Sequence, residues 1–163
     1  MAPTFGTSGL RGLVTELTDD LVAGYTRSFL AMCPVGSGLW VGRDLRDSSP
    51  RLAEVVIAAA RGEGVAVTDC GAVPTPALAM ASMAAGAAAV MVTGSHIPAD
   101  RNGLKFYVPG GEITKADEAA ILAGLGRKAA DLTAVRRSTF DLSGDWAARY
   151  RGAFGHCLDG MKV

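Results

Sequence analysis

The sequence predicts a three-layer α/β/α sandwich around a mostly parallel, mixed sheet, and three observations support this prediction. Short apolar runs of strand length alternate with segments of helix length. The strand runs are continuously apolar, which is typical of strands covered on both faces. Glycine, proline and capping residues separate one element from the next. Together these features indicate strand–helix–strand units with helices on both faces of the sheet.

The composition limits the possible classes of protein. A chain of 163 residues with 49% hydrophobic content fits one domain with a sizeable core. Sixteen basic and sixteen acidic residues give a formal charge of zero, which argues against nucleic acid or an anionic membrane as the main partner. Cys33, Cys70 and Cys157 are widely spaced and have no metal-ligand spacing, so we expect free thiols in a reducing compartment.

No basic segment followed by an apolar stretch occurs at the start of the sequence, so we expect no secretory signal. The longest apolar run, Ala77 to Val92, is shorter than a membrane span and is interrupted by Ser82 and Gly86. A buried helix followed by a buried strand explains this run better. We therefore expect a cytoplasmic protein.

The first elements are expected in this order. A helix opens after Thr18 as its N-cap and runs toward Met32, with acidic residues in its first turn. A short strand follows at residues 39–41. A second helix starts at Ser48 and Ser49, where a serine is expected to cap it and the next residue, a proline, suits the first turn.

The middle of the chain leads to a serine at a strand end. A strand is expected at 65–68, and Thr75 is expected to cap a third helix that runs through Met83. The next strand, at 89–92, is apolar and stops at a small polar corner. Ser95 is therefore expected to lie exposed just after this strand.

The remaining elements are less regular. Asn102 and Gly103 predict a turn, followed by a short strand at 104–107. A helix is expected over 114–124. Periodicity is lost over 127–143, which predicts an exposed linker, and a last helix is expected from about Asp145 to about Gly160.

The loop after Ser95 combines groups that can move protons with cationic donors. His96, Asp100, Arg101 and Lys105 all fall within it or directly after it. Such a concentration suits phosphate chemistry better than packing. Acyl hydrolysis is disfavoured because Ile97 replaces the second glycine that a G-x-S-x-G elbow requires.

Four motifs carry a family resemblance. They are AVMVTGSHIP at 89–98 with NGLK at 102–105, FGTSGLRG at 5–12, GRDLRDSS at 42–49, and GAVPTP at 71–76. In this order they resemble the motifs of the α-D-phosphohexomutases, the phosphomannomutase and phosphoglucomutase family. Ile97 stands where many members carry Asn, although Ile also occurs there. The resemblance implies a fold of the phosphohexomutase domain I type.

The resemblance implies the following site. Ser95 matches the phosphorylated serine. Catalytic roles are implied for Ser95, Lys105, His96 and Arg11, and contacts with substrate or phosphate for Thr7, Ser8, Arg11, His96, Asn102 and Lys105. Mg²⁺ is the implied cofactor, bound through the Ser95 phosphate and by aspartates of a domain that these residues do not include. A lysine or arginine alone could equally be a solvated surface residue or part of an ion pair.

Other polar and sulfur-containing residues have plainer interpretations. Arg43, Asp44 and Arg46 are expected to form a salt-bridge network that shapes their loop, and Ser48 and Ser49 are expected to act as caps. Cys70 and the methionines at 80, 83 and 91 are assigned to the core, because they fall on apolar segments.

The implied function is that of the catalytic first domain of a mutase that interconverts hexose 1-phosphate and hexose 6-phosphate through a hexose 1,6-bisphosphate. The alternative is a non-catalytic, phosphorylatable binding module. Residues 1–143 are expected to form the phosphoserine domain, and 144–163 a linker helix and the start of a second domain, with a strand opening at 161–163. We expect these residues alone to be inactive, with the rest of a mutase chain, or weak self-association, as the protein partner.

Overall fold

The computed structural model of this chain describes residues 3–6, 9–130, 132, 135–155 and 160. The strands are β1 (Thr4–Gly6), β2 (Gly9–Leu13), β3 (Leu39–Arg43), β4 (Val67–Ala72), β5 (Ala88–Val92), β6 (Arg101–Val108), β7 (Gly111–Glu112) and β8 (Arg137–Thr139). The helices are α1 (Asp19–Met32), α2 (Ser49–Gly62), α3 (Thr75–Ala84), α4 (Lys115–Ala123) and α5 (Ser143–Phe154). The predicted alternation is confirmed from α1 to β5.

All strands join one sheet in the order β1-β2-β6-β5-β3-β4-β8, with β7 paired to β6. The strands β5, β3, β4 and β8 are parallel, whereas β6, β2, β1 and β7 pair in the antiparallel sense. The sheet is mixed as predicted, and its parallel part is limited to four strands. Because parallel strands bring their carboxyl ends to one edge, the loops after β3 and β5 lie side by side there.

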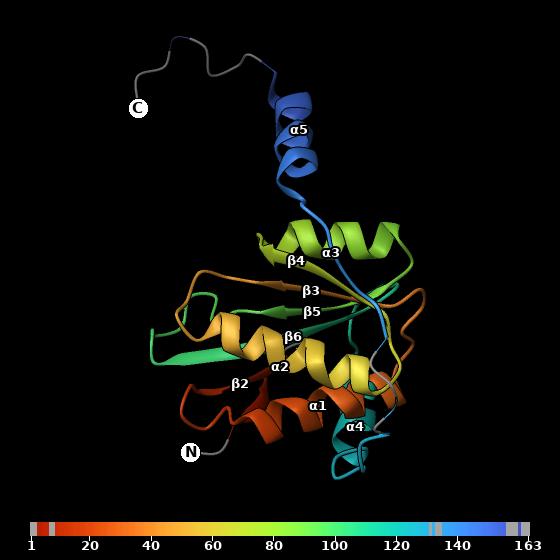
Figure 1. The fold of residues 1–163 in the computed structure, drawn as a ribbon. Coiled ribbons are helices and arrows are strands. Elements are labelled where there is room, and N and C mark those ends of the chain that lie inside the picture. The colour runs from red at the N-terminus through yellow and green to blue at the C-terminus, as the bar shows by residue number, and fades with distance from the viewer. Residues whose placement is uncertain (1–2, 7–8, 131, 133–134, 156–159, 161–163) are drawn as a thin grey trace.

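Helices cover both faces of the sheet, as Figure 1 shows. On one face α1 and α2 bury a core that includes Phe29, Val56 and Phe106. On the other face α3 packs against a smaller cluster that includes Leu78 and Met91. Side chains alternate between the faces along each strand, so the register decides which residues share a face.

Only the start of α1 follows the predicted capping chemistry in full, and α4 carries a cap that was not predicted. Thr18 accepts a hydrogen bond from the Leu21 amide at 3.3 Å at the start of α1. Thr114 and Asp117 form a reciprocal capping box at the start of α4. Ser48, in contrast, makes no side-chain cap on α2. The N-cap of α3 is Pro74, so the prediction for Thr75 is wrong, whereas Ser48 occupies the predicted N-cap position without the expected side-chain bond.

Several strand predictions also need correction. The strand expected at 65–68 begins at Val67 instead. Asn102 and Gly103 are not a turn, because both lie within β6 and pair with β2. The region expected as a linker contains β8, which adds to the parallel edge of the sheet beside β4. Arg137 of β8 explains this addition, since its guanidinium forms ion pairs with Glu54 at 2.6 Å and Asp69 at 2.7 Å.

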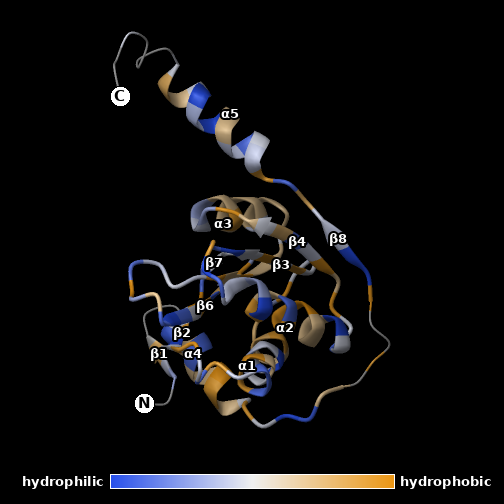
Figure 2. Ribbon diagram, turned by 60° about the vertical axis from the view of Figure 1, so that its left-hand side comes forward, coloured by the Kyte–Doolittle hydropathy of each residue, from blue (hydrophilic) through white to orange (hydrophobic). Residues whose placement is uncertain are grey.

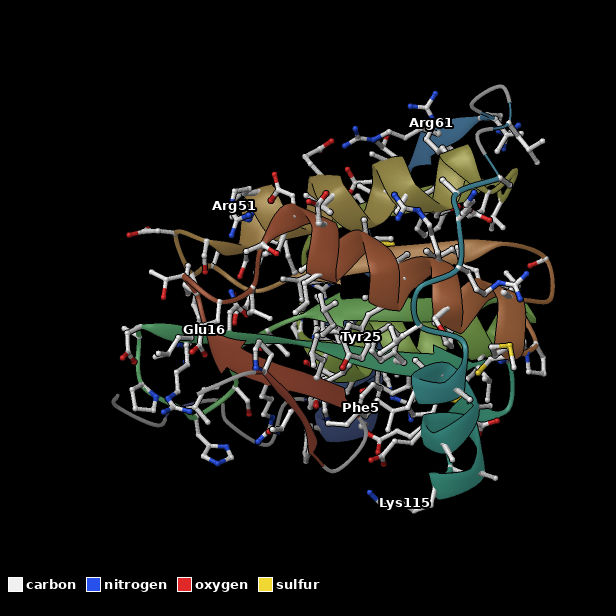
Figure 3. All side chains as sticks on the ribbon, turned by 90° about the horizontal axis from the view of Figure 1, so that it is seen from below. Phe5, Glu16, Tyr25, Arg51, Arg61 and Lys115 are labelled. Carbon is white, nitrogen blue, oxygen red and sulfur yellow. The ribbon has the colours of Figure 1, made fainter. Side chains whose placement is uncertain are left out.

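The N-terminal pair β1 and β2 was not predicted, because glycine-rich runs carry little strand signal. Phe5 of β1 lies over the sheet beside Tyr25 of α1, as Figure 3 shows, with ring centroids 5.6 Å apart. The same ring stacks on Phe106 of β6 at 5.9 Å. Aromatic contacts of this kind hold the short β1 strand onto the core.

The last described helix, α5, extends away from the sheet and its covering helices (Figure 1). It runs from Ser143 to Phe154, and so starts and ends earlier than the sequence predicted. None of its residues is buried, whereas Leu142 directly before it is 4% exposed. Hydrophobic and hydrophilic residues alternate along it in Figure 2. The strand expected at 161–163 lies outside the described residues.

The sulfur-containing residues divide into two groups. Met91 and Cys70 are buried as predicted, and Cys33 is also buried with a free thiol. Met80 and Met83 are 36% and 38% exposed, so their assignment to the core is wrong. The reason is that α3 is apolar around its whole circumference but contacts the sheet with only one side.

Cys157 lies outside the described residues. Within the described ranges, no helix combines the length and the apolar character needed to cross a bilayer.

Candidate functional site

Ser95 lies where the chain leaves the fully buried strand β5. Thr93 and Gly94 are still buried, and Ser95 is the first exposed residue, as predicted. Its φ of 50° is the one positive φ of a non-glycine residue in the described part of the chain. Such a backbone conformation is costly for a residue with a Cβ atom and persists where the surroundings fix it. Contacts with the loop after β3 hold this corner.

The carboxylate of Asp44, just after β3, lies under the corner. Oδ2 accepts from the Thr93 hydroxyl and from the Gly94 amide, both at 2.9 Å. Oδ1 accepts from the Arg46 amide at 3.0 Å and from the Ser49 hydroxyl at 2.5 Å. Burial raises the pKa of Asp44, but the hydrogen bonds, that from Ser49 foremost, outweigh it and lower the pKa below its usual range. Asp44 is therefore ionised and fully engaged.

Arg46 fixes the rest of the loop through backbone carbonyls. Its guanidinium donates to the carbonyl oxygens of Ile97 at 2.5 Å, Pro98 at 2.6 Å, Arg101 at 3.0 Å and Ser95 at 3.3 Å. Of these carbonyls, that of Pro98 also accepts from the Arg101 amide at 3.1 Å. The planar fork of five donors makes arginine suited to such a task.

Glycine is required at position 94 because the Arg46 guanidinium lies against it, where a Cβ atom would collide. Asp44 and Arg46 also pair directly at 3.5 Å. Of the predicted salt-bridge network, the pair of Asp44 with Arg46 is confirmed, whereas Arg43 donates to the backbone carbonyl of Asp44 at 3.4 Å. The purpose of the pair, to hold the Ser95 loop, was not visible in the sequence because the two segments are far apart in the chain.

Asn102 has a different place from the one expected. Its side chain is 0% exposed and donates to the Ser48 hydroxyl at 2.8 Å and to the Ser49 hydroxyl at 2.9 Å. Its own oxygen accepts from the Gly103 amide at 2.8 Å. Asn102 therefore ties β6 to the start of α2 and offers no surface to a ligand. The same contacts explain why Ser48 and Ser49 do not cap the helix.

Arg11 and Lys105 lie on the same face of the sheet. Arg11 pairs with Gly103 across β2 and β6, and its side chain passes over that glycine. Lys105 is two residues further along β6 and is opposite Met91 of β5. Because directly paired residues share a face, both cations lie on the side of the sheet that α3 covers. Neither has a hydrogen bond to Ser95 among the described contacts.

Of the remaining predicted residues, His96 lies beside Ser95, whereas Lys105 lies beside Glu112. The exposed His96 follows Ser95, and its Nδ1 lies 3.2 Å from Ser95 Oγ. The Lys105 amine lies 3.4 Å from a carboxylate oxygen of Glu112. Thr7 and Ser8 lie outside the described residues. The structure thus brings together Ser95 and His96, and separately aligns Arg11 with Lys105.

Comparison with known proteins identifies relatives of this chain. The family model described as phosphoglucomutase/phosphomannomutase, alpha/beta/alpha domain I matches residues 2–131. A phosphomannomutase of Sinorhizobium fredii is 51% identical over 142 residues, which cover 83% of this chain and 30% of that protein. A phosphoglucosamine mutase of Rhodococcus jostii is 35% identical over 179 aligned residues, covering all of this chain and 40% of that protein.

A solved structure shows the same fold. The phosphoglucomutase/phosphomannomutase family protein of Burkholderia thailandensis superposes with a TM-score of 0.73 at 26% identity. The match covers 89% of this chain and 34% of that one. This chain thus spans about a third of the length of the relatives it matches. It belongs to the α-D-phosphohexomutase family and corresponds to the α/β/α domain I of its members.

Proposed function

We propose that this chain is the phosphoserine domain of a mutase that interconverts hexose 1-phosphate and hexose 6-phosphate through a hexose 1,6-bisphosphate. The supporting observation is the exposed Ser95 hydroxyl on a strained corner that Asp44 and Arg46 hold in place. Such rigidity is useful because phosphoryl transfer depends mainly on positioning and charge neutralisation. No observation favours the alternative of a non-catalytic binding module.

In the proposed reaction, phosphorylated Ser95 meets the free hydroxyl of a hexose monophosphate. The bond between Ser95 Oγ and phosphorus breaks as phosphorus bonds to the substrate oxygen. The proton of that hydroxyl is passed on to Oγ, and His96 Nδ1, which lies 3.2 Å from Oγ, is the proposed carrier. The bisphosphate then turns over and returns its other phosphoryl group to Ser95 by the reverse of these steps.

Arg11 and Lys105 are proposed to neutralise the migrating phosphoryl group. Both lie on one face of the sheet, on β2 and β6. An arginine fork and a mobile ammonium are suited to phosphate oxygens, and Lys105 would also assist proton transfer. The proposed contacts of Thr7 and Ser8 with phosphate complete this set.

The implied Mg²⁺ does not fit the described residues alone. None of their acidic, histidine and cysteine side chains form a group of three that could hold a metal. Asp44 is near Ser95, but both of its carboxylate oxygens are engaged. We propose that a cation would bind to the Ser95 phosphate together with ligands from elsewhere, and we assign no step to it. For the same reason, we propose that residues 1–143 carry the phosphoserine but do not support net turnover alone.

The test is to incubate the chain with glucose 1,6-bisphosphate and to locate phosphate by intact mass and phosphopeptide mapping. We expect label on Ser95, and none in the Ser95→Ala variant. Ser138→Ala is the matched control, since Ser138 lies on β8 at the opposite edge of the sheet and its loss should leave labelling unchanged. A coupled mutase assay on the same samples should show no net turnover. Phosphate found only on Ser48, Ser49 or Ser138 would reject the assignment.

A further inference from the structure

Glu112 is a charged residue that the proposed reaction does not use. It belongs to β7, which folds back on β6 so that Glu112 is directly opposite Tyr107. One oxygen, Oε1, lies 3.4 Å from the Lys105 amine and 3.5 Å from the Tyr107 hydroxyl. The carboxylate is thus shared by two neighbouring side chains on this face of β6.

Tyr107 provides a second contact to the Glu112 carboxylate. The residue is 4% exposed, and its burial, followed by the charge of Glu112, raises its pKa to about 12. The phenol therefore keeps its proton at neutral pH and remains a donor to Glu112. Because Tyr107 donates to the Glu112 carboxylate, the carboxylate has a defined position, and the Lys105 amine can form an ion pair with it there.

The surroundings allow Lys105 a second position. Lys105 and Tyr107 line one side of a pocket of about 360 Å³ between α3 and the β6–β7 hairpin. In the other direction along β6 lies Gly103, about 7 Å away at the usual rise of a strand. The Gly103 carbonyl accepts from the Thr93 amide at 3.0 Å, two residues before Ser95. A flexible lysine on this strand can therefore point either toward Glu112 or toward the Ser95 loop.

We propose that Glu112 is a positioning residue that holds Lys105 at the hairpin while Ser95 is free, and releases it when Ser95 carries a phosphoryl group. The pair is weak, because the side chain of Glu112 is 50% exposed and solvent screens it. A phosphoserine carries about two negative charges near neutral pH and competes well for a single ammonium. This inference rests on the proposed function, since it assigns Lys105 to the phosphorylated serine.

The experiment compares the chain carrying phosphoserine at position 95, installed during translation, with the unmodified chain. Each is treated with a limiting amount of acetic anhydride, and acetylation of Lys105 is quantified by mass spectrometry. In the unmodified chain, Glu112→Gln should raise Lys105 acetylation about 2- to 5-fold, the range expected for a half-exposed pair. In the phosphorylated chain the same variant should change it by less than about 1.5-fold, because Lys105 has moved to the phosphate.

Lys115 provides the internal reference, since it forms an ion pair with Glu118 on α4. Glu118→Gln should change the acetylation of Lys115 and leave the acetylation of Lys105 unchanged. In the wild-type sequence, phosphoserine should itself lower Lys105 acetylation while Lys115 stays constant, which tests the inference without any variant.

Two results would overturn it: an equal effect of Glu112→Gln with and without phosphoserine, or no effect in either. Because the phosphoserine is installed, a failure of Ser95 to accept phosphate from a bisphosphate would count against the proposed function and not against this inference.

Discussion

At the scale of the residue, the conformation of Ser95 depends on a carboxylate supplied by another loop. Asp44 accepts from Thr93 and Gly94, the two residues that set the corner. Asp44→Asn removes the charge and turns one acceptor into a donor facing other donors. We expect a loss of about 1.5–3 kcal/mol in the free energy of unfolding at pH 7, the cost of disrupting hydrogen bonds to a half-buried charge. Urea denaturation measures it, and Ser95 labelling should fall in parallel.

The pH dependence of this effect has a definite sign. The pKa of Asp44 is lowered on folding, so its contribution to stability is present above the unfolded value, near 4. It is lost as the pH falls through the lower folded value. The stability difference between the wild-type chain and Asp44→Asn should therefore be constant from pH 6 to pH 7 and shrink below about pH 4. The control is Asp47→Asn at an exposed position of the same loop, which should change the free energy of unfolding by less than about 0.5 kcal/mol at pH 7.

Most residues of the site could be identified from the sequence, but their mutual contacts could not. Ser95, His96 and the network of Asp44 with Arg46 were all singled out from their polar, glycine-containing context. Asn102 was assigned to a turn because Asn-Gly favours turns locally. Pairing with β2 and a buried bond to two serines outweigh that preference. Such bonds join distant segments, which local sequence patterns do not report.

At the scale of the element, Asn102 joins the central strand β6 to the first turn of α2. Its amide donates to Ser48 and Ser49; Asn102 and Ser49 are buried, and Ser48 is half-buried. Asn102→Ala should lower the free energy of unfolding by about 1–3 kcal/mol, because it leaves buried hydroxyls without their donor. Ser37→Ala, which removes an exposed hydroxyl bonded to Ala85, should cost less than about 0.5 kcal/mol. Equal costs would contradict the role given to Asn102.

A helix could be predicted from the sequence where interactions among its own residues determine its first turn. Thr18 and the Thr114–Asp117 pair carry capping chemistry that acts within one turn, and both helices start as expected. β8 could not be predicted, since it is a strand only because β4 offers it an open edge. The hairpin of β1 and β2 likewise depends on contacts with β6 and on the ring of Phe5.

At the scale of the whole molecule, α5 is the described helix without a buried residue. Trp146, Tyr150 and Phe154 contact one another along one side of the helix, with ring centroids 4.9 and 6.0 Å apart. Tyr150 and Phe154 are nevertheless 48% and 58% exposed. A helix of twelve residues is marginal in water without tertiary packing. Exposed rings of this kind also favour weak self-association.

The proposed boundary of the phosphoserine domain at residue 143 leads to a test of this view. A chain that ends at residue 143 should keep its free energy of unfolding within about 1 kcal/mol, because no residue of α5 is buried. Amide hydrogens of α5 should exchange fast in the longer chain, and sedimentation velocity should show less self-association after truncation. Leu142→Ala is the control that should lower the free energy of unfolding. Leu142 is 4% exposed in the cluster under α3, so its truncation should cost about 2–5 kcal/mol. If removal of α5 cost as much as Leu142→Ala, the helix would be part of the folded unit and the boundary would lie beyond it.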